Sequence, residues 1–484
     1  MNFTHSYSQL GDAFFEYSVP MAVSSPRLLL WNQALSTQLQ ITASLQNDSQ
    51  LQAQYFSGSV LPPTASPIAL AYCGHQFGHL NPQLGDGRAH LLGELIDTAN
   101  QRVDVQLKGS GPTPYSRQGD GRCALGPAIR EYLMSEAMYY LGVPTTRCLA
   151  VVATGEPVYR ETIKPGAVVT RVAESHIRVG TFQFFAIRGD ITSLTTLLDY
   201  AVDRHFPAIN KADGNTALLF LSAVIERQIT LVTQWLRVGF IHGVMNTDNT
   251  AISGETIDFG PCAMMGIYNP ATVYSSIDTQ GRYAFANQPN ITLWNMTRLA
   301  ECLLPLIDSD QDAAIAMVEP VLMQAGKTMV RQRYKMLANK LGLSDIDDKN
   351  TGFIDALLLI MQENQLDYTN TFISLTQSIK SGNNLDKLHP AIVSWLPSWR
   401  QQLAAAGQND TEAAALMAQN NPVVIPRNHH IEAVLTQCEE SGSAQPAEDF
   451  LSVLRSPYQT LAATANYQDL PEDNDKGYRT FCGT

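Results

Sequence analysis

The chain has no excess of basic residues. Its 484 residues include 32 Lys and Arg against 45 Asp and Glu, which gives a formal net charge of −13. Proteins that bind nucleic acid over a broad surface neutralise its phosphates with Lys and Arg, so no nucleic-acid partner is expected. Any polyanionic ligand must therefore be held by a local basic pocket.

Cysteine is scarce and its spacing is irregular. The number of cysteines is odd, and none forms a CxxC pair or another metal-binding spacing; the seven are Cys73, Cys123, Cys148, Cys262, Cys302, Cys438 and Cys482. This usage is typical of a reducing compartment. A zinc site is accordingly not expected.

Neither a secretory signal peptide nor a membrane span is expected from the sequence. Residues 1–20 have no basic start followed by an apolar core, which a secretory signal would need. No uninterrupted apolar run approaches about 18 residues, the length that predicts a membrane span. We therefore expect no membrane association and a cytoplasmic location.

A β-rich region follows a turn-rich segment at 61–67. Alternating apolar residues predict strands at 90–96, 102–108, 147–152 and 167–172. In the second of these, Val105 and Leu107 point to one face. Lys108 then lies on the opposite face, where it could look into a cleft rather than the core.

A helix is predicted between the second and third strands. Proline is common in the first turn of a helix, where Pro127 would lie. Glycine is common just after the last turn, where Gly142 would lie. Apolar residues recur at helical spacing at Ile129, Leu133 and Ala137. Glu131 lies off that stripe, so its carboxylate can face something other than the core.

The second half of the chain is mainly helical in pattern. Residues 216–238 are apolar on most sides, which predicts a deeply buried helix.

The length of the chain predicts roughly two to four structural units. We place them at 1–60 (an N-terminal extension), 61–180 (a β-rich small lobe), 181–400 (a mainly helical large lobe) and 401–484 (a helical extension and tail).

The most informative motif is HGVMNTDN at 242–249, followed nine residues later by Asp258-Phe259-Gly260. Kinase-like phosphotransferases use a loop His-x-Asp-x-x-x-x-Asn and then Asp-Phe-Gly, in which the Asn and the second Asp hold magnesium. Asn249 and Asp258 fall in these places. The motif and the order of elements predict an α+β, protein-kinase-like fold with two lobes. The small lobe is expected to be β-rich and the large lobe mainly helical.

The position of the usual catalytic base is occupied by Val244, which cannot accept a proton. Asp248 is the only carboxylate within the loop that could replace it. The alternative interpretation is that Asn246, Asp248 and Asn249 merely satisfy hydrogen bonds of a turn. Metal and nucleotide binding are therefore expected, whereas ordinary γ-phosphoryl transfer is not.

Several residues upstream are candidates for a phosphate pocket. Lys108 and Glu131, 23 residues apart, would form a strand-to-helix ion pair at the cleft. The tetrapeptide Gly-Asp-Gly-Arg occurs at 85–88 and 119–122, where glycines allow close backbone approach and Arg donates to phosphate. Arg171 and Arg178 would add charge. The alternatives are solvated surface charges and simple Asp-Gly turns.

Five segments closely resemble the selenoprotein O family: YCGHQFG at 72–78, QLGDGR at 83–88, QLKGSGPTPYSR at 106–117, residues 171–180, and 242–249. The resemblance covers most of the chain. It implies a kinase-like fold and a protein adenylyltransferase that binds ATP in a reversed orientation. Such an enzyme transfers AMP to Ser, Thr or Tyr hydroxyls of proteins and releases pyrophosphate, and UMP transfer from UTP is attributed to bacterial members.

The resemblance also implies a role for each matching residue. Asp248 would accept the proton, Asn249 and Asp258 would hold Mg²⁺ or Mn²⁺, and Glu131 would pair with Lys108. The nucleotide would contact Gly85, Gly87, Arg88, Lys108, Asp120, Gly121, Arg171, Arg178 and Asp258. Animal members carry selenocysteine near the C-terminus, and Cys482 occupies a similar place, so a redox role is conceivable there.

Two other functions remain compatible with the sequence. One is a protein or small-molecule kinase, and the other is a nucleotide-binding pseudokinase scaffold without activity. The retained Asn249 and Asp258 argue against the scaffold. The sequence does not identify the target proteins, the choice between ATP and UTP or between Mg²⁺ and Mn²⁺, or the oligomeric state.

Overall fold

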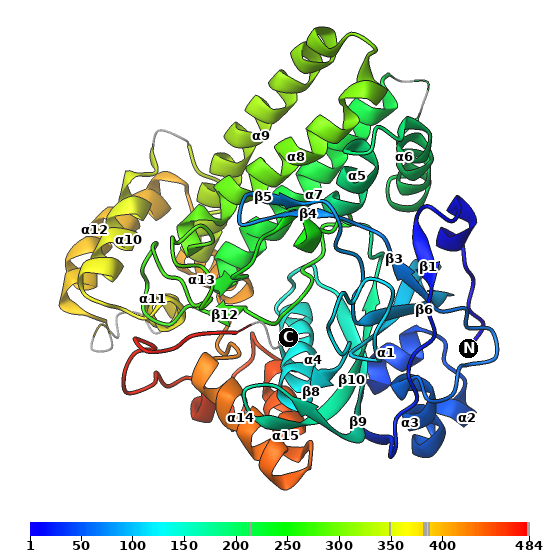
Figure 1. Cartoon of the computed structure of the whole chain (residues 1–484). Helices are drawn as coiled ribbons and strands as arrows, with labels where there is room; N and C mark the ends of the chain where they lie inside the picture. The colour runs from blue at the N-terminus through cyan, green and yellow to red at the C-terminus, as the bar shows by residue number, and fades with distance from the viewer. Residues whose placement is uncertain (211, 213, 348–349, 381–384, 386–387, 482–484) are drawn as a thin grey trace.

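The computed structural model describes the whole chain except residues 211, 213, 348–349, 381–384, 386–387 and 482–484. The described residues form a β-sheet lobe and a helical lobe (Figure 1). The predicted α+β, two-lobed, kinase-like fold is confirmed. Cys482, for which a redox role was considered, lies outside the described residues.

The sheet lobe is built on an eight-stranded antiparallel sheet. Its order is β1-β3-β6-β7-β10-β9-β2, with the short β8 paired to β10. The strands are β1 (Phe15–Tyr17), β2 (Arg27–Trp31), β3 (Ile68–Leu70), β6 (Ala89–Ile96), β7 (Arg102–Lys108), β8 (Cys123–Ala124), β9 (Arg147–Tyr159) and β10 (Ile163–Ala173). All four predicted strands are present. Residues 1–60 supply two strands of the same sheet.

The two faces of β7 have different surroundings, because side chains alternate along a strand. Val105 and Leu107 are fully buried in a cluster with Phe56. That face is covered by three short helices, α1 (Gln33–Gln38), α2 (Ala43–Gln46) and α3 (Ser49–Ser57). Gln106 and Lys108 therefore point to the opposite face, toward the cleft.

The predicted helix after β8 is α4 (Leu125–Tyr140), which packs against β9 and β10. It ends before Gly142, whose positive φ of 76° only glycine adopts readily. Two helices from the end of the chain, α14 (Asn428–Ser441) and α15 (Gln445–Leu454), pack against α4 (Figure 1). The C-terminal region thus covers the helix of the sheet lobe.

The helical lobe is organised around α7 (Thr216–Val238), the predicted apolar helix. Asn215 caps its start by accepting a hydrogen bond from the Leu218 N–H, and Gly239 ends it at φ 78°. The helix is long and apolar enough to span a membrane, but it packs between neighbouring helices as a core helix does. It packs against α6 (Ile191–His205), α8 (Gln288–Ile307) and α9 (Gln311–Lys340), and Phe182 of α5 (Val179–Ala186) contacts its Phe220 with ring centroids 5.4 Å apart.

A second group of helices extends the helical lobe: α10 (Gly352–Glu363), α11 (Tyr368–Lys380), α12 (Pro390–Ala405) and α13 (Asp410–Asn420). Two short hairpins complete the fold. β11 (Phe240–Ile241) pairs with β12 (Ala263–Met264) and encloses the motif loop. β4 (Gly74–Gln76) pairs with β5 (His79–Asn81) and lies over the helical lobe (Figure 1). The proposed unit boundaries at 60, 180 and 400 remain predictions.

A buried ion pair fastens α4 to β9. The Arg147 guanidinium donates to Glu136 Oε2 at 2.6 Å, and Glu136 is fully buried. We predict that Glu136→Ala lowers the free energy of unfolding by about 3–5 kcal/mol, because it leaves the Arg147 charge buried and unpaired. Chemical denaturation measures this change.

The matched control is Glu301→Gln, which removes an exposed carboxylate paired with Arg298 on α8. Exposed pairs contribute less than about 1 kcal/mol. Equal losses of stability in the two variants would show that burial does not set the strength of the Glu136 contact.

Candidate active site

A cavity of about 570 Å³ lies between the two lobes. Eleven of the twelve residues singled out from the sequence line it: Gly85, Gly87, Arg88, Lys108, Asp120, Gly121, Arg171, Arg178, Asp248, Asn249 and Asp258. The twelfth, Glu131, lies directly behind Lys108. The structure thus brings together residues from β7, β10, the two Gly-rich segments and the motif loop.

Four charged groups form a connected cluster in this cavity. Lys108 Nζ contacts Glu131 Oε2 at 2.6 Å and Asp258 Oδ1 at 2.7 Å. The Arg171 guanidinium donates to Glu131 Oε1 at 2.5 and 2.8 Å. Lys108 and Arg171 lie on neighbouring strands, where their cleft-facing side chains converge on one helix carboxylate.

The cluster keeps both of its carboxylates ionised. Burial alone would raise the pKa of Asp258, but Lys108 and Arg171 outweigh it and lower that pKa far below its usual range. The pKa of Glu131 is lowered for the same reason, with Arg171 and Lys108 overcoming the effect of burial. Asp258 also adopts a positive φ of 66°, a conformation that non-glycine residues hold only when their surroundings enforce it.

Asn249 and Asp258 offer a donor set that suits Mg²⁺. The Asn249 side-chain amide donates to the Val244 carbonyl at 3.1 Å, which leaves its Oδ1 available. Asp258 supplies an ionised carboxylate, and both residues line the cavity. A carboxylate and an amide oxygen are hard ligands of the kind Mg²⁺ takes together with water and phosphate. The residues present therefore fit the metal.

Arg178 is buried beside the cluster with part of its hydrogen-bonding capacity unused. Its Nη2 donates to Asp86 Oδ1 at 3.4 Å, and its guanidinium lies 4.2 Å from the centre of the Tyr72 ring. Among the described residues, Nε and Nη1 have no hydrogen-bond partner. Buried donors almost always have a partner, so the unused donors indicate a site for an anionic ligand.

The two Gly-Asp-Gly-Arg segments form interlocking turns at the cavity wall. A Cβ on Gly85 would lie 2.3 Å from the Tyr115 ring, and one on Gly121 would lie 2.2 Å from the Gly111 backbone. Thr113 Oγ1 donates to the Asp86 carbonyl at 2.7 Å. Both positions need glycine, because a Cβ would clash with the Tyr115 ring at Gly85 and with backbone at Gly121.

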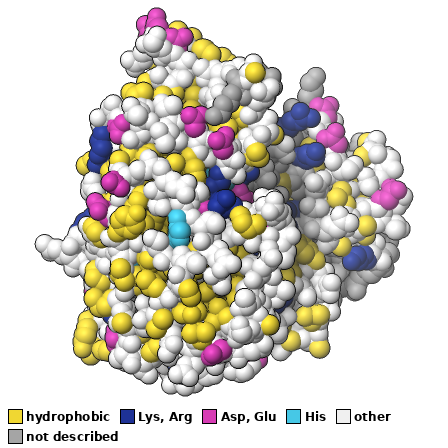
Figure 2. Space-filling model, turned by 90° about the vertical axis from the view of Figure 1, so that its right-hand side faces the viewer, with side chains coloured by type: hydrophobic (Ala, Val, Ile, Leu, Met, Phe, Trp, Pro, Cys, Tyr) yellow, Lys and Arg dark blue, Asp and Glu magenta, His cyan; other side chains and the backbone are white. Residues whose placement is uncertain are grey.

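The Asp residues of the two segments have different roles in the structure. Asp86 is buried and pairs with Arg178, whereas the more exposed Asp120 pairs with Arg160 at 2.7 Å. Arg160 also lines the cavity. On the face shown in Figure 2, one group of Lys and Arg lies near the centre and the other basic side chains are scattered, whereas the cavity is lined by these cations: Arg88, Lys108, Arg117, Arg122, Arg160, Arg171 and Arg178. Positive charge is thus concentrated locally in an acidic protein.

Asp248 lies in the same cavity with a pKa near neutrality. Burial raises the pKa of this carboxyl to about 6. Gln76 Nε2 donates to Oδ2 at 3.2 Å, and a Cβ on Gly74 would lie 2.6 Å from Oδ1. Val244, at the position of the usual base, is buried and aliphatic. Asp248 is thus held against the β4–β5 hairpin and can change protonation state near pH 6.

The hairpin holds the whole motif loop. The His75 N–H donates to Thr247 Oγ1 at 2.7 Å, and the Phe77 N–H donates to Asn246 Oδ1 at 3.1 Å. Thr247 in turn donates to Gln183 on α5 at 2.6 Å. Backbone of the sheet lobe and side chains of the helical lobe therefore meet at the loop that carries Asp248.

Known proteins resemble this chain over most or all of its length. Residues 1–455 match the model of the family described as protein adenylyltransferase SelO. The chain belongs to the SelO family. A protein of Teredinibacter turnerae described as protein nucleotidyltransferase YdiU is 51% identical over 485 residues, with both chains fully covered. Proteins of the same description from Pseudoalteromonas translucida (50% identical, both fully covered) and Rhizobium johnstonii (48% identical, 100% of this chain and 97% of the other) are also similar.

Membership of the SelO family makes the chain a nucleotidyltransferase of the protein adenylyltransferase kind. Sequence reasoning about this site missed several residues that line the cavity: Tyr72, Gln76, Gln106, Tyr115, Arg117, Arg160 and Asn246. Arg122, predicted as a phosphate donor in the second Gly-Asp-Gly-Arg segment, also lines the cavity. Gly78 is the one local signal in the sequence, because glycine favours the tight turn of a hairpin. The positive φ of Phe77 is a feature of the structure that its residue type does not predict.

We predict that Gly74→Ala lowers kcat by roughly 100-fold, because the new methyl group must displace the Asp248 carboxylate. The KM for ATP should change little, since Gly74 does not line the cavity. Steady-state adenylylation kinetics measure both. Gly352→Ala is the control, because a Cβ there meets nothing within 4 Å; a kcat of Gly74→Ala equal to that of this control would contradict the positioning argument.

We also predict that Lys108→Ala and Arg178→Ala each weaken ATP binding by about 1.5–3 kcal/mol, the usual value of a charge-assisted hydrogen bond. Isothermal titration calorimetry measures the affinity. Lys164→Ala serves as a control, because Lys164 pairs with Glu439 outside the cavity. Unchanged affinity in both cavity variants would rule out the basic pocket.

Proposed function

We propose that the enzyme transfers AMP from ATP to Ser, Thr or Tyr hydroxyls of other proteins and releases pyrophosphate, and that it also uses UTP to transfer UMP. One observation carries the proposal. The buried cations Lys108, Arg171 and Arg178 gather at the sheet side of the cavity, while burial raises the pKa of the cavity-lining Asp248 to about 6. A kinase base is missing at Val244.

This arrangement favours a nucleotide whose terminal phosphates enter the basic pocket. Two buried N–H groups of Arg178 have no partner among the described residues and can donate to phosphate. Lys108 contacts the carboxylates of Glu131 and Asp258, and a phosphate oxygen can bind beside them or take the place of one of them. With the β- and γ-phosphates held there, the α-phosphate faces the acceptor hydroxyl. The adenosine then lies toward the open part of the cleft, where Tyr115 and the Gly-rich segments line the wall.

The reaction balances with the residues at hand. Asp248 accepts the proton of the acceptor hydroxyl, whose oxygen forms a bond to the α-phosphorus. The bond from the α-phosphorus to the bridging oxygen of the β-phosphate breaks, and pyrophosphate leaves with that oxygen. Lys108, Arg171 and Arg178 stabilise the charge that develops on the leaving group.

Mg²⁺ or Mn²⁺ fits the same site. Asn249 and Asp258 would hold the ion, which would neutralise charge on the phosphate oxygens. Asp258 is kept ionised for this by Lys108 and Arg171. Glu131 does not touch the nucleotide in this scheme; it orients Lys108 and Arg171.

Intact-mass spectrometry of a protein substrate tests the proposal. We expect the mass of an added AMP group after incubation with ATP, and no product with Asp248→Asn, since an amide cannot accept the proton. A substrate that gains only a phosphate group would identify a kinase instead. A wild-type enzyme that binds ATP but yields neither product nor pyrophosphate would identify a scaffold.

The pH profile tests the assignment of the base separately. Because Asp248 must be ionised and its pKa is about 6, kcat should rise about tenfold per pH unit below pH 6 and level off above it. Gln76→Leu removes a hydrogen bond that stabilises the carboxylate, so its profile should shift to higher pH. An unshifted profile would exclude Asp248 as the titrating group.

A further inference from the structure

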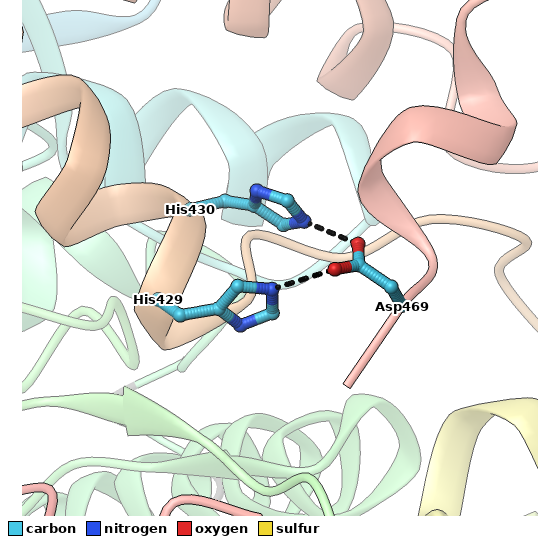
Figure 3. A group of neighbouring side chains, drawn as sticks. All are labelled: His429, His430 and Asp469. Carbon is cyan, nitrogen blue, oxygen red and sulfur yellow. Dashed lines mark hydrogen bonds and ion pairs between the residues drawn. The ribbon is translucent and has the colours of Figure 1, made fainter. Parts of the chain in front are cut away.

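Two adjacent histidines at the start of α14 face one carboxylate from the C-terminal segment (Figure 3). His429 Nε2 lies 3.4 Å from Asp469 Oδ2, and His430 Nε2 lies 2.7 Å from Asp469 Oδ1. Each of the three residues offers one ligand atom, and these atoms lie within 4.8 Å of one another. None of the three lines the cavity that contains Asn249 and Asp258, and they have no part in the reaction proposed above.

The fold holds these side chains in a converging arrangement. Successive residues of a helix point about 100° apart, yet the two imidazole rings have centroids only 4.0 Å apart. His430 packs edge-on against Tyr467, at 5.1 Å, and tilted against Phe450, at 6.1 Å. The aromatic contacts fix the second ring, and Asp469 follows Tyr467 by two residues, so the same segment supplies both the support and the carboxylate.

One atom of the cluster lacks a partner. His429 Nδ1 is buried, and among the described residues it has no hydrogen bond. This nitrogen points away from Asp469 (Figure 3), so a bound water would satisfy it, while the Nε2 atom that faces Asp469 stays available as a metal ligand. The remaining surface is partly open, with side-chain exposures of 25% for His429, 17% for His430 and 58% for Asp469, so an ion can enter.

We propose that His429, His430 and Asp469 bind one transition-metal ion of the Zn²⁺ class. Zn²⁺ binds imidazole nitrogen and carboxylate oxygen at about 2.0–2.2 Å, which places tetrahedral ligand atoms roughly 3.3 Å apart. The two nitrogen–oxygen distances, 2.7 and 3.4 Å, run to different oxygens of Asp469, and all three ligand atoms lie within 4.8 Å of one another, so small rotations of the side chains bring them to that separation. Imidazole favours Zn²⁺, Cu²⁺ and Ni²⁺ over Mg²⁺, and water would complete the coordination.

No zinc site was expected from the sequence because of the spacing of the cysteines. The site proposed here contains no cysteine, so that spacing does not apply to it. Coordination requires neutral imidazoles whose lone pairs face the ion. The ion therefore takes the place of the two hydrogen bonds to Asp469. The site is built for an ion that prefers nitrogen, whereas the active-site pair of Asn249 and Asp258 supplies only oxygen.

The ion would fasten the C-terminal segment to α14. Beyond Asp469 this segment returns to the catalytic region, where the Tyr478 hydroxyl contacts Glu432 at 2.7 Å and Arg130 at 3.1 Å. Arg130 precedes Glu131 on α4. Thr480 Oγ1 donates to the Pro261 carbonyl, just after the Asp258 motif, at 2.6 Å. Metal binding at the start of α14 would thus stabilise the C-terminal segment. This segment contacts the neighbours of Glu131 through Tyr478 and the neighbours of Asp258 through Thr480.

Equilibrium dialysis of the full-length protein against ZnCl₂ tests the proposal. The measurement uses an Asp258→Asn background, so that zinc at the active-site pair is not counted. We expect one bound Zn²⁺ and a higher Tm when it is bound. His430→Ala and Asp469→Asn should each weaken binding by at least about 10-fold, and Asp469→Asn keeps the shape of the side chain and one acceptor oxygen.

Glu472→Gln is the matched control, because it removes an exposed carboxylate three residues along the same segment. This variant should bind Zn²⁺ like its parent. Co²⁺ in place of Zn²⁺ should give visible absorption bands typical of low coordination number, and these should disappear in His429→Ala. No bound Zn²⁺, or equal affinity in the His430, Asp469 and Glu472 variants, would overturn the proposal.

Discussion

The fold of the cleft depends on one buried carboxylate, Glu131. Two cations from neighbouring strands converge on it, and one of them, Lys108, continues to Asp258 in the other lobe. Burying charges costs free energy that their mutual attraction must offset, so the two cations are needed to keep the carboxylates of Glu131 and Asp258 ionised. The sheet, α4 and the motif loop are therefore joined at Glu131. Lys108, Arg171 and Asp258 are already held in position before the nucleotide binds.

Much of this cluster could be predicted from the sequence, because its geometry follows from local periodicity. Alternation in β7 buries Leu107 and turns Lys108 the other way, and the apolar stripe of α4 leaves Glu131 off the core. The spacing of Asn249 and Asp258 depends only on the loop and the short β11–β12 hairpin that encloses it. In each case a few consecutive residues determine which way a side chain points.

Contacts between distant segments could not be predicted in this way. His75 meets Thr247 across 172 residues, and Tyr115 lies beneath Gly85 because two turns interlock. The strands β1 and β2 join the sheet from a region that carried no recognisable motif. Asp469 and His430 are likewise brought together only by tertiary packing. Neither hydrophobic pattern nor turn chemistry encodes such pairings, which depend on how complete lobes meet.

The β4–β5 hairpin has a consequence for motion between the lobes. It extends from the sheet lobe, yet its backbone and Gln76 bind the loop of the helical lobe that carries Asp248. If the lobes separated to admit ATP, the hairpin would either travel with the loop or release it. If the hairpin released the loop, the Asp248 carboxylate would lose its orientation and would be exposed to water. Asp248 could then accept a proton from the acceptor hydroxyl only when the lobes are closed. Hydrolysis of ATP by water in the open state would therefore be suppressed.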